Sequence, residues 1–99
     1  MQLKNSKEIK QAIVTHLTPT EIDRLIAEVG GYTEQGEEAT VRATLITCGS
    51  NPRNWYRVAK EVSGGVVFRS FTLRQYEDIS CAVETQRDGT VLGFEFSLD

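Results

Sequence analysis

The spacing of apolar residues changes once along the chain, and this change constrains the fold more than any other feature. In residues 1–31 apolar residues recur at the helical interval of three or four, whereas from residue 39 onward they alternate with polar ones. Helices and strands do not alternate, so parallel βαβ units are not predicted. The order predicts an α+β domain in which a helical hairpin, residues 1–31, packs on one face of an antiparallel sheet, residues 39–98.

Each of the two expected helices begins with a capping signal. Asn5 is followed three residues later by a glutamate, which is the spacing of a capping box. Thr18 precedes Pro19, which suits the first position of a helix. The second helix is expected to end at Gly30-Gly31, because glycine adopts the left-handed conformation of a C-cap. Together these signals predict two short helices before the sheet.

The sheet is expected to be a meander of about five strands, because consecutive strands are joined by short turn sequences. The first three strands are expected at residues 39–47, 55–62 and 66–73. Gly64-Gly65 permits the positive φ angles of a tight hairpin. Residues 72–78 carry mixed signals, and a turn or one short helical turn is expected there.

The last hairpin has a register that the sequence itself can test. If Asp88-Gly89 is the turn, one face of the hairpin becomes almost wholly apolar, and a shift of one residue destroys that agreement. The expected facing pairs are Ile79 with Leu98, Cys81 with Phe96, Val83 with Phe94, and Thr85 with Leu92.

Length and composition predict one small cytoplasmic domain. The chain has 99 residues, a net charge of −3 and no apolar run long enough to span a membrane. Its first residues lack the apolar core of a signal peptide. Cys48 and Cys81 lack CxxC spacing and His16 is the one histidine, so we expect reduced cysteines, no metal site and no cofactor.

No catalytic residue is predicted. Cys48 with His16 is the one cysteine–histidine combination that could form a nucleophile and a base. A strand-end cysteine and a helix-terminal histidine explain both residues without catalysis. The carboxylates in residues 34–38 and 77–78 are read as solvated, since a general acid needs an apolar pocket.

Charge is segregated along the chain. Residues 39–75 contain six Lys and Arg against one Glu, whereas residues 76–99 contain six Asp and Glu against one Arg. One interpretation is that neighbouring hairpins of opposite charge favour their own pairing. The other is that the central strands present a basic surface to an acidic partner or to a nucleic-acid backbone.

The segment around Trp55 is the candidate contact surface, because Arg, Trp and Tyr are enriched in interface hot spots. Tyr56 is expected to point toward the core, so that Trp55 is exposed on the other face as a partner anchor. The predicted partner-binding residues are Arg53, Asn54, Trp55 and Arg57.

Lys60 and Arg69 form a second candidate site, for an anion or phosphate. With Gly64-Gly65 as the turn they face each other, and like charges in that position are unfavourable. A register error or a β-bulge would remove the conflict, whereas a carboxylate such as Glu84, or an external anion, would bridge the two cations.

These observations predict a small non-enzymatic protein-interaction module, a regulator, adaptor or inhibitor that docks on another macromolecule. The alternative is a nucleic-acid-binding module that uses the Arg-rich central strands. An enzyme with an unrecognised site ranks third. The steep salt dependence of phosphate contacts separates the first two classes experimentally. The sequence predicts neither the partner nor the oligomeric state.

Overall fold

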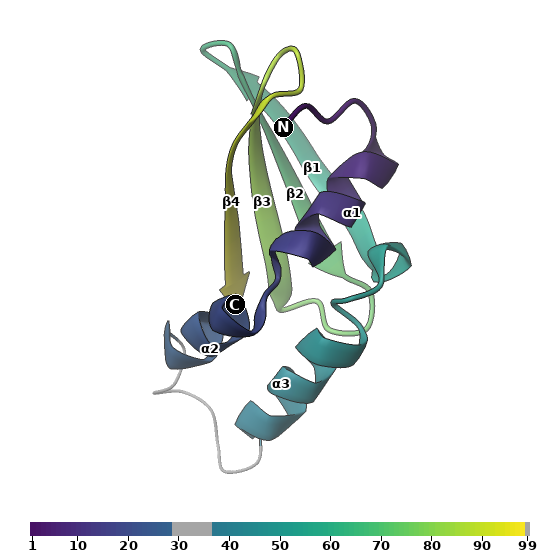
Figure 1. The fold of residues 1–99 in the computed structure, drawn as a ribbon, viewed down its shortest axis with the longest axis vertical. Helices are drawn as coiled ribbons and strands as arrows, with labels where there is room; N and C mark the ends of the chain where they lie inside the picture. The colour runs from purple at the N-terminus through teal and green to yellow at the C-terminus, as the bar shows by residue number, and fades with distance from the viewer. Residues whose placement is uncertain (29–36, 99) are drawn as a thin grey trace.

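The computed structural model describes residues 1–28 and 37–98. Within these ranges the domain combines three α-helices with a four-stranded antiparallel sheet in the order β1-β2-β3-β4 (Figure 1). The α+β class and the meander are confirmed, with four strands in place of five. The elements are α1 (Ser6–His16), α2 (Pro19–Glu28), α3 (Glu37–Thr47), the 3-10 helix η1 (Pro52–Asn54), β1 (Trp55–Ser63), β2 (Val66–Leu73), β3 (Ile79–Gln86) and β4 (Val91–Leu98).

The capping signals of the first two helices are confirmed. The Asn5 side chain accepts a hydrogen bond from the Glu8 backbone N–H at 2.9 Å, which satisfies a donor that the first helical turn leaves open. Thr18 accepts in the same way from the Glu21 N–H at 3.2 Å, and Pro19 is the first residue of α2. The predicted cap at Gly30-Gly31 lies outside the described residues.

The predicted strand over residues 39–47 is wrong, because this segment belongs to α3. Val41 and Leu45 are four residues apart, lie on one helix face, and are 2% and 1% exposed. The hydroxyls of Thr44 and Thr47 donate to backbone carbonyls four residues earlier, at 2.9 and 2.7 Å. Apolar residues at 41, 43 and 45 fit the alternation of a strand, but residues 41 and 45 also have the i, i+4 spacing that lies on one face of a helix. Burial of that pair outweighs the β propensity of the segment.

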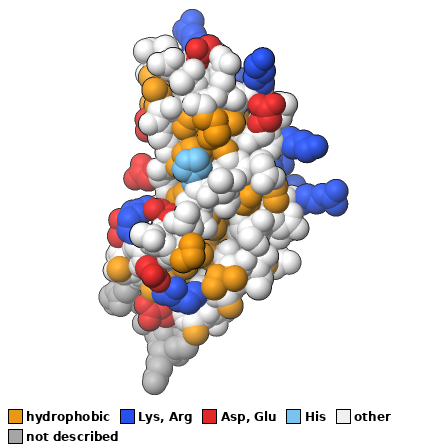
Figure 2. Space-filling model, viewed as in Figure 1, with side chains coloured by type: hydrophobic (Ala, Val, Ile, Leu, Met, Phe, Trp, Pro, Cys, Tyr) orange, Lys and Arg blue, Asp and Glu red, His pale blue; other side chains and the backbone are white. Residues whose placement is uncertain are grey.

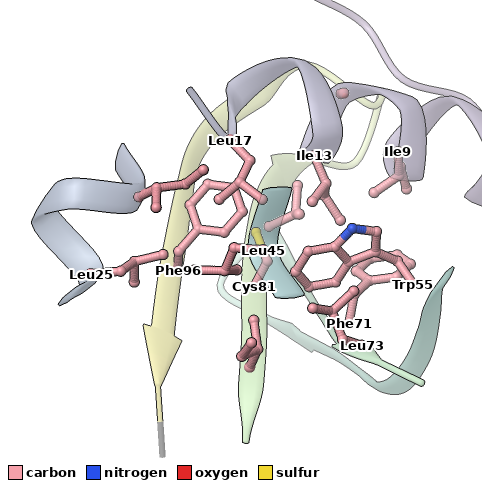
Figure 3. Close-up of a cluster of buried hydrophobic side chains, with 14 of the residues drawn as sticks. Ile9, Ile13, Leu17, Leu25, Leu45, Trp55, Phe71, Leu73, Cys81 and Phe96 are labelled. Carbon is pink, nitrogen blue, oxygen red and sulfur yellow. The ribbon is translucent and has the colours of Figure 1, made fainter. Parts of the chain in front are cut away.

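The core lies between α1 and one face of the sheet. Figure 1 shows α1 lying across this face, with α2 and α3 near the end where β4 finishes. Figure 3 shows side chains from all three helices and from the sheet meeting in this layer. Its most enclosed large side chains include Ile9, Ile13, Leu25, Leu45, Trp55, Phe71 and Ile79.

The last hairpin has the predicted register over most of its length. The pairs Ile79–Leu98, Cys81–Phe96 and Val83–Phe94 are confirmed. Beyond them a bulge between Glu84 and Thr85 places Thr85 opposite Val91, so the predicted pair of Thr85 with Leu92 is wrong. Residues 74–78 form the expected turn, whereas residues 72 and 73 still belong to β2.

The start of the chain is fixed against the β3–β4 turn. Gln2 forms an isolated antiparallel bridge with Thr90. The Leu3 N–H donates to the Gly89 carbonyl at 2.7 Å, and the Val91 N–H donates to the Met1 carbonyl at 2.9 Å. Residues near the two ends of the sequence therefore pair side by side.

Candidate functional site

Trp55 is a core residue, so its predicted role as an exposed anchor is wrong. It is 0% exposed, its Nε1–H donates to the Gly49 carbonyl at 2.9 Å, and its ring meets the edge of Phe96. Tyr56, predicted to face the core, is half-buried on the opposite face and lies under the Arg74 guanidinium, 5.1 Å from the ring centroid. The two residues have exchanged the faces that the sequence predicted for them.

A bulge in β1 causes this exchange. Lys60 pairs with Arg69 as predicted, but the register shifts between Arg57 and Ala59. The extra residue moves every preceding side chain to the other face, so Trp55, not Tyr56, pairs with Leu73. A bulge was one of the expected ways to keep the two cations from facing each other. The observed bulge precedes Lys60 in the sequence, so Lys60 and Arg69 still face each other.

The other predicted partner-binding residues, Arg53, Asn54 and Arg57, differ in exposure and in their contacts. Asn54 is structural, because its side-chain amide donates to the Cys48 carbonyl at 3.1 Å. Arg53 is exposed, while its backbone carbonyl accepts from Arg74 Nε at 3.2 Å, which holds η1 in place. Arg57 is exposed on the helix-facing side of β1, opposite Phe71. Arg53 and Arg57 therefore remain available for contact.

Lys60 and Arg69 are not bridged by a carboxylate in the part of the chain that the structure describes. Arg69 donates to the hydroxyl of Thr85 at 2.9 Å, and Thr85 is buried. Glu84, the expected bridge, pairs with Phe68 and Gly93 and so projects from the other face. The conflict between the two cations therefore persists within the described chain.

Four cations thus lie on η1 and on the helix-facing side of β1 and β2, and two of them, Lys60 and Arg69, face each other. The ion pairs within residues 1–28 and 37–98 involve Arg24 and Arg42 and none of these four. We call this group the basic surface, and it consists of Arg53, Arg57, Lys60 and Arg69.

The opposite face of the sheet has the opposite charge. The strand pairing places Glu61, Glu84 and Glu95 on that face and assigns no lysine or arginine of the four strands to it. Arg69 pairs with Val83 and not with an acid. The cations and anions of the four strands therefore lie on opposite faces of the sheet and do not pair across strands.

Two lysines of α1 lie close to Arg53 of the basic surface, although their position in the sequence does not indicate it. Lys7 and Lys10, together with Arg53, line a cavity of about 370 Å³ between α1 and η1. Figure 2 shows Lys and Arg side chains along the edge of the molecule where α1 begins and η1 lies. Their spacing of three residues indicates a shared helix face, but the sequence does not reveal that η1 packs beside it.

Cys48 and His16 have separate partners and do not form a dyad. The Cys48 thiol donates to Gln75 Oε1 at 2.9 Å. The His16 ring stacks on Phe94 with centroids 4.0 Å apart, and its Nδ1 lies 2.9 Å from the Ala12 carbonyl oxygen. Both residues are therefore explained by local structure.

The two cysteines should differ sharply in reactivity. Burial raises the pKa of the Cys81 thiol, the nearby Glu21 carboxylate adds to the increase, and the side chain is 0% exposed. Because the thiolate is the reacting species, iodoacetamide at ~pH 8 should label Cys48 in the native protein and both cysteines in urea. Mass spectrometry of tryptic peptides checks this. Native labelling of Cys81 at the rate of Cys48 would contradict the burial of Cys81.

Comparison of the chain with protein-family models, with curated proteins and with solved structures finds no match. None of the described helices has the length and apolar character needed to cross a bilayer. Within the described ranges, no group of three or more His, Cys, Asp or Glu side chains is arranged to hold a metal ion.

Proposed function

We propose that this protein is a non-enzymatic interaction module that docks through its basic surface on an acidic surface of another protein. The observation that carries the proposal is the gathering of Arg53, Arg57, Lys60 and Arg69 with no carboxylate partner among the described residues. Like charges held together raise the free energy of the isolated protein, and an acidic partner relieves that repulsion.

Two features favour a protein partner over a nucleic acid. The chain carries a net charge of −3, and the far side of the sheet bears Glu61, Glu84 and Glu95, which repel an extended phosphate backbone. Binding to single strands also depends on exposed aromatic rings. Trp55 is buried and Tyr56 lies on the acidic side, so neither ring accompanies the basic surface.

The test compares two charge-reversal variants with the same change in net charge. Arg57→Glu/Lys60→Glu alters exposed positions of the basic surface, and Lys4→Glu/Arg87→Glu alters exposed positions elsewhere. Tagged wild type should capture a protein from nuclease-treated lysate of the native host. The affinity of that purified partner should fall at least about tenfold in the first variant and less than about twofold in the second.

The same proteins test the nucleic-acid alternative. We expect no binding to single- or double-stranded oligonucleotides in ~150 mM salt. Micromolar oligonucleotide binding that is lost in Arg57→Glu/Lys60→Glu would overturn the protein-docking proposal in favour of the alternative. Equal losses of protein binding in both variants would show that net charge, and not this surface, governs the interaction.

A further inference from the structure

The lining of the cavity between α1 and η1 is rich in cations. Its lining consists of Lys7, Lys10, Gln11, Asn51, Pro52 and Arg53, so three of its six residues are cations and none is an acid. A larger hollow of about 610 Å³, bounded by residues 1–16, includes Glu8 in its lining. The cavity between α1 and η1 is therefore richer in positive charge than this larger hollow.

The cations of this cavity are held by the fold. Lys7 and Lys10 are three residues apart on α1, which Asn5 caps. Arg53 belongs to η1. Its backbone N–H donates a hydrogen bond to the Asn51 side-chain oxygen at 3.0 Å, and its carbonyl accepts one from Arg74. Because Asn51 accepts through its oxygen, its NH₂ group remains a donor beside the cavity. The cavity is thus rich in donors supplied by two packed elements.

None of the three cations has an ion pair in the described part of the chain. Phosphate offers several charged acceptor oxygens, which several ammonium and guanidinium groups can bind at once. A volume of about 370 Å³ lies within the range of roughly 300–1,000 Å³ that is usual for small-molecule sites. Charge and size therefore favour a small ligand that carries more than one negative charge.

We propose that this cavity binds a phosphate-bearing ligand with at least two negative charges. Lys7 and Lys10 contact the phosphate from α1, and Arg53 contacts it from η1. The inference goes beyond the proposed docking function. The cavity shares Arg53 with the basic surface, but Lys7 and Lys10 lie outside that surface, so the inference does not depend on the docking function.

Inorganic pyrophosphate is the first probe, followed in isotope-labelled protein by NMR titration in ~150 mM salt. We expect saturable shifts at residues 7–11 and 51–53. The apparent Kd should rise at least about tenfold in Lys7→Gln/Lys10→Gln and less than about twofold in Lys4→Gln/Arg87→Gln, which removes the same charge outside the cavity. Arg57→Glu/Lys60→Glu should change it by less than about threefold, so the two proposals can fail separately.

A phosphoserine peptide and its unphosphorylated form identify the source of the phosphate. Tighter binding of the phosphopeptide than of pyrophosphate assigns the site to a modified protein, and weaker binding assigns it to a free phosphate compound. Absence of saturation by both probes at about 5 mM would overturn the proposal. Equal losses of affinity in Lys7→Gln/Lys10→Gln and Lys4→Gln/Arg87→Gln would overturn it as well, because binding would then follow net charge alone.

Discussion

Replacing Trp55 with alanine should destabilise this protein by about 3–5 kcal/mol, the range observed for truncating a buried tryptophan. The side chain is 0% exposed, packs against Phe96 and donates to the Gly49 carbonyl. A domain of this size has a total stability on the order of 5–15 kcal/mol. The loss should lower Tm by roughly 15–30 °C, as measured by thermal and urea unfolding followed by circular dichroism.

Two further variants separate the contributions of Trp55 and test its face. Trp55→Phe keeps an aromatic ring but removes the indole N–H, so it should cost less than Trp55→Ala while leaving the Gly49 carbonyl without its donor. Tyr56→Ala removes a neighbouring ring from the face of the sheet opposite α1, where Tyr56 is only half-buried, and should cost at most about 1–2 kcal/mol. A greater loss from Tyr56→Ala than from Trp55→Ala would contradict the bulge in β1 and restore the face assignment that the sequence predicted.

Gly89→Ala should be the second strongly destabilising substitution, costing about 3 kcal/mol. Gly89 has a φ of +92°, where a side chain is strained, and a Cβ at this position would clash with the Leu3 carbonyl oxygen. The backbone of the N-terminal segment must move to relieve that contact. This movement would break the hydrogen bond from the Leu3 N–H to the Gly89 carbonyl.

Gly64→Ala is the matched control for this clash. Gly64 also has positive φ, +58°, but a Cβ there would meet no atom within 4 Å. Its cost should be about 1 kcal/mol, from backbone strain alone. Urea unfolding gives the difference between the two variants, and hydrogen exchange at the Leu3 amide should accelerate in Gly89→Ala alone. Equal free-energy losses would show that the N-terminal segment does not press on the turn.

Local signals predicted the parts of this fold in which chain neighbours determine the geometry. The caps at Asn5 and Thr18 were read correctly because capping involves residues three apart. The last hairpin was read correctly up to Val83–Phe94 because both strands are defined by one turn and one apolar face. The helix over residues 37–47 was not predicted, because the apolar spacing of this segment fits both a strand and a helix. Burial of Val41 and Leu45 in the folded protein favours the helix, and the sequence does not reveal that burial.

The sequence predicted the positive charge of the candidate site but not the arrangement of its side chains. The six cations of residues 39–75 are visible in the sequence, and the facing of Lys60 and Arg69 follows from the Gly64-Gly65 turn. A bulge leaves no comparable local mark, so the exchange of Trp55 and Tyr56 could not be read from alternation. The approach of Lys7 and Lys10 to Arg53 is a tertiary contact between segments more than forty residues apart, and no periodicity encodes it.

The pairing of residues 1–3 with residues 89–91 determines when the N-terminal segment can reach its final position during synthesis. The helix α1 leaves the ribosome before the strands of this sheet, yet its buried residues share one core with Phe71, Val83 and Phe96. Its leading segment can be fixed only after Val91 has been made. Contacts so distant in sequence form slowly because a long loop must close first. A nascent chain therefore carries α1 with its apolar face uncovered until β2, β3 and β4 have been made, and apolar surface exposed in this way favours aggregation during folding.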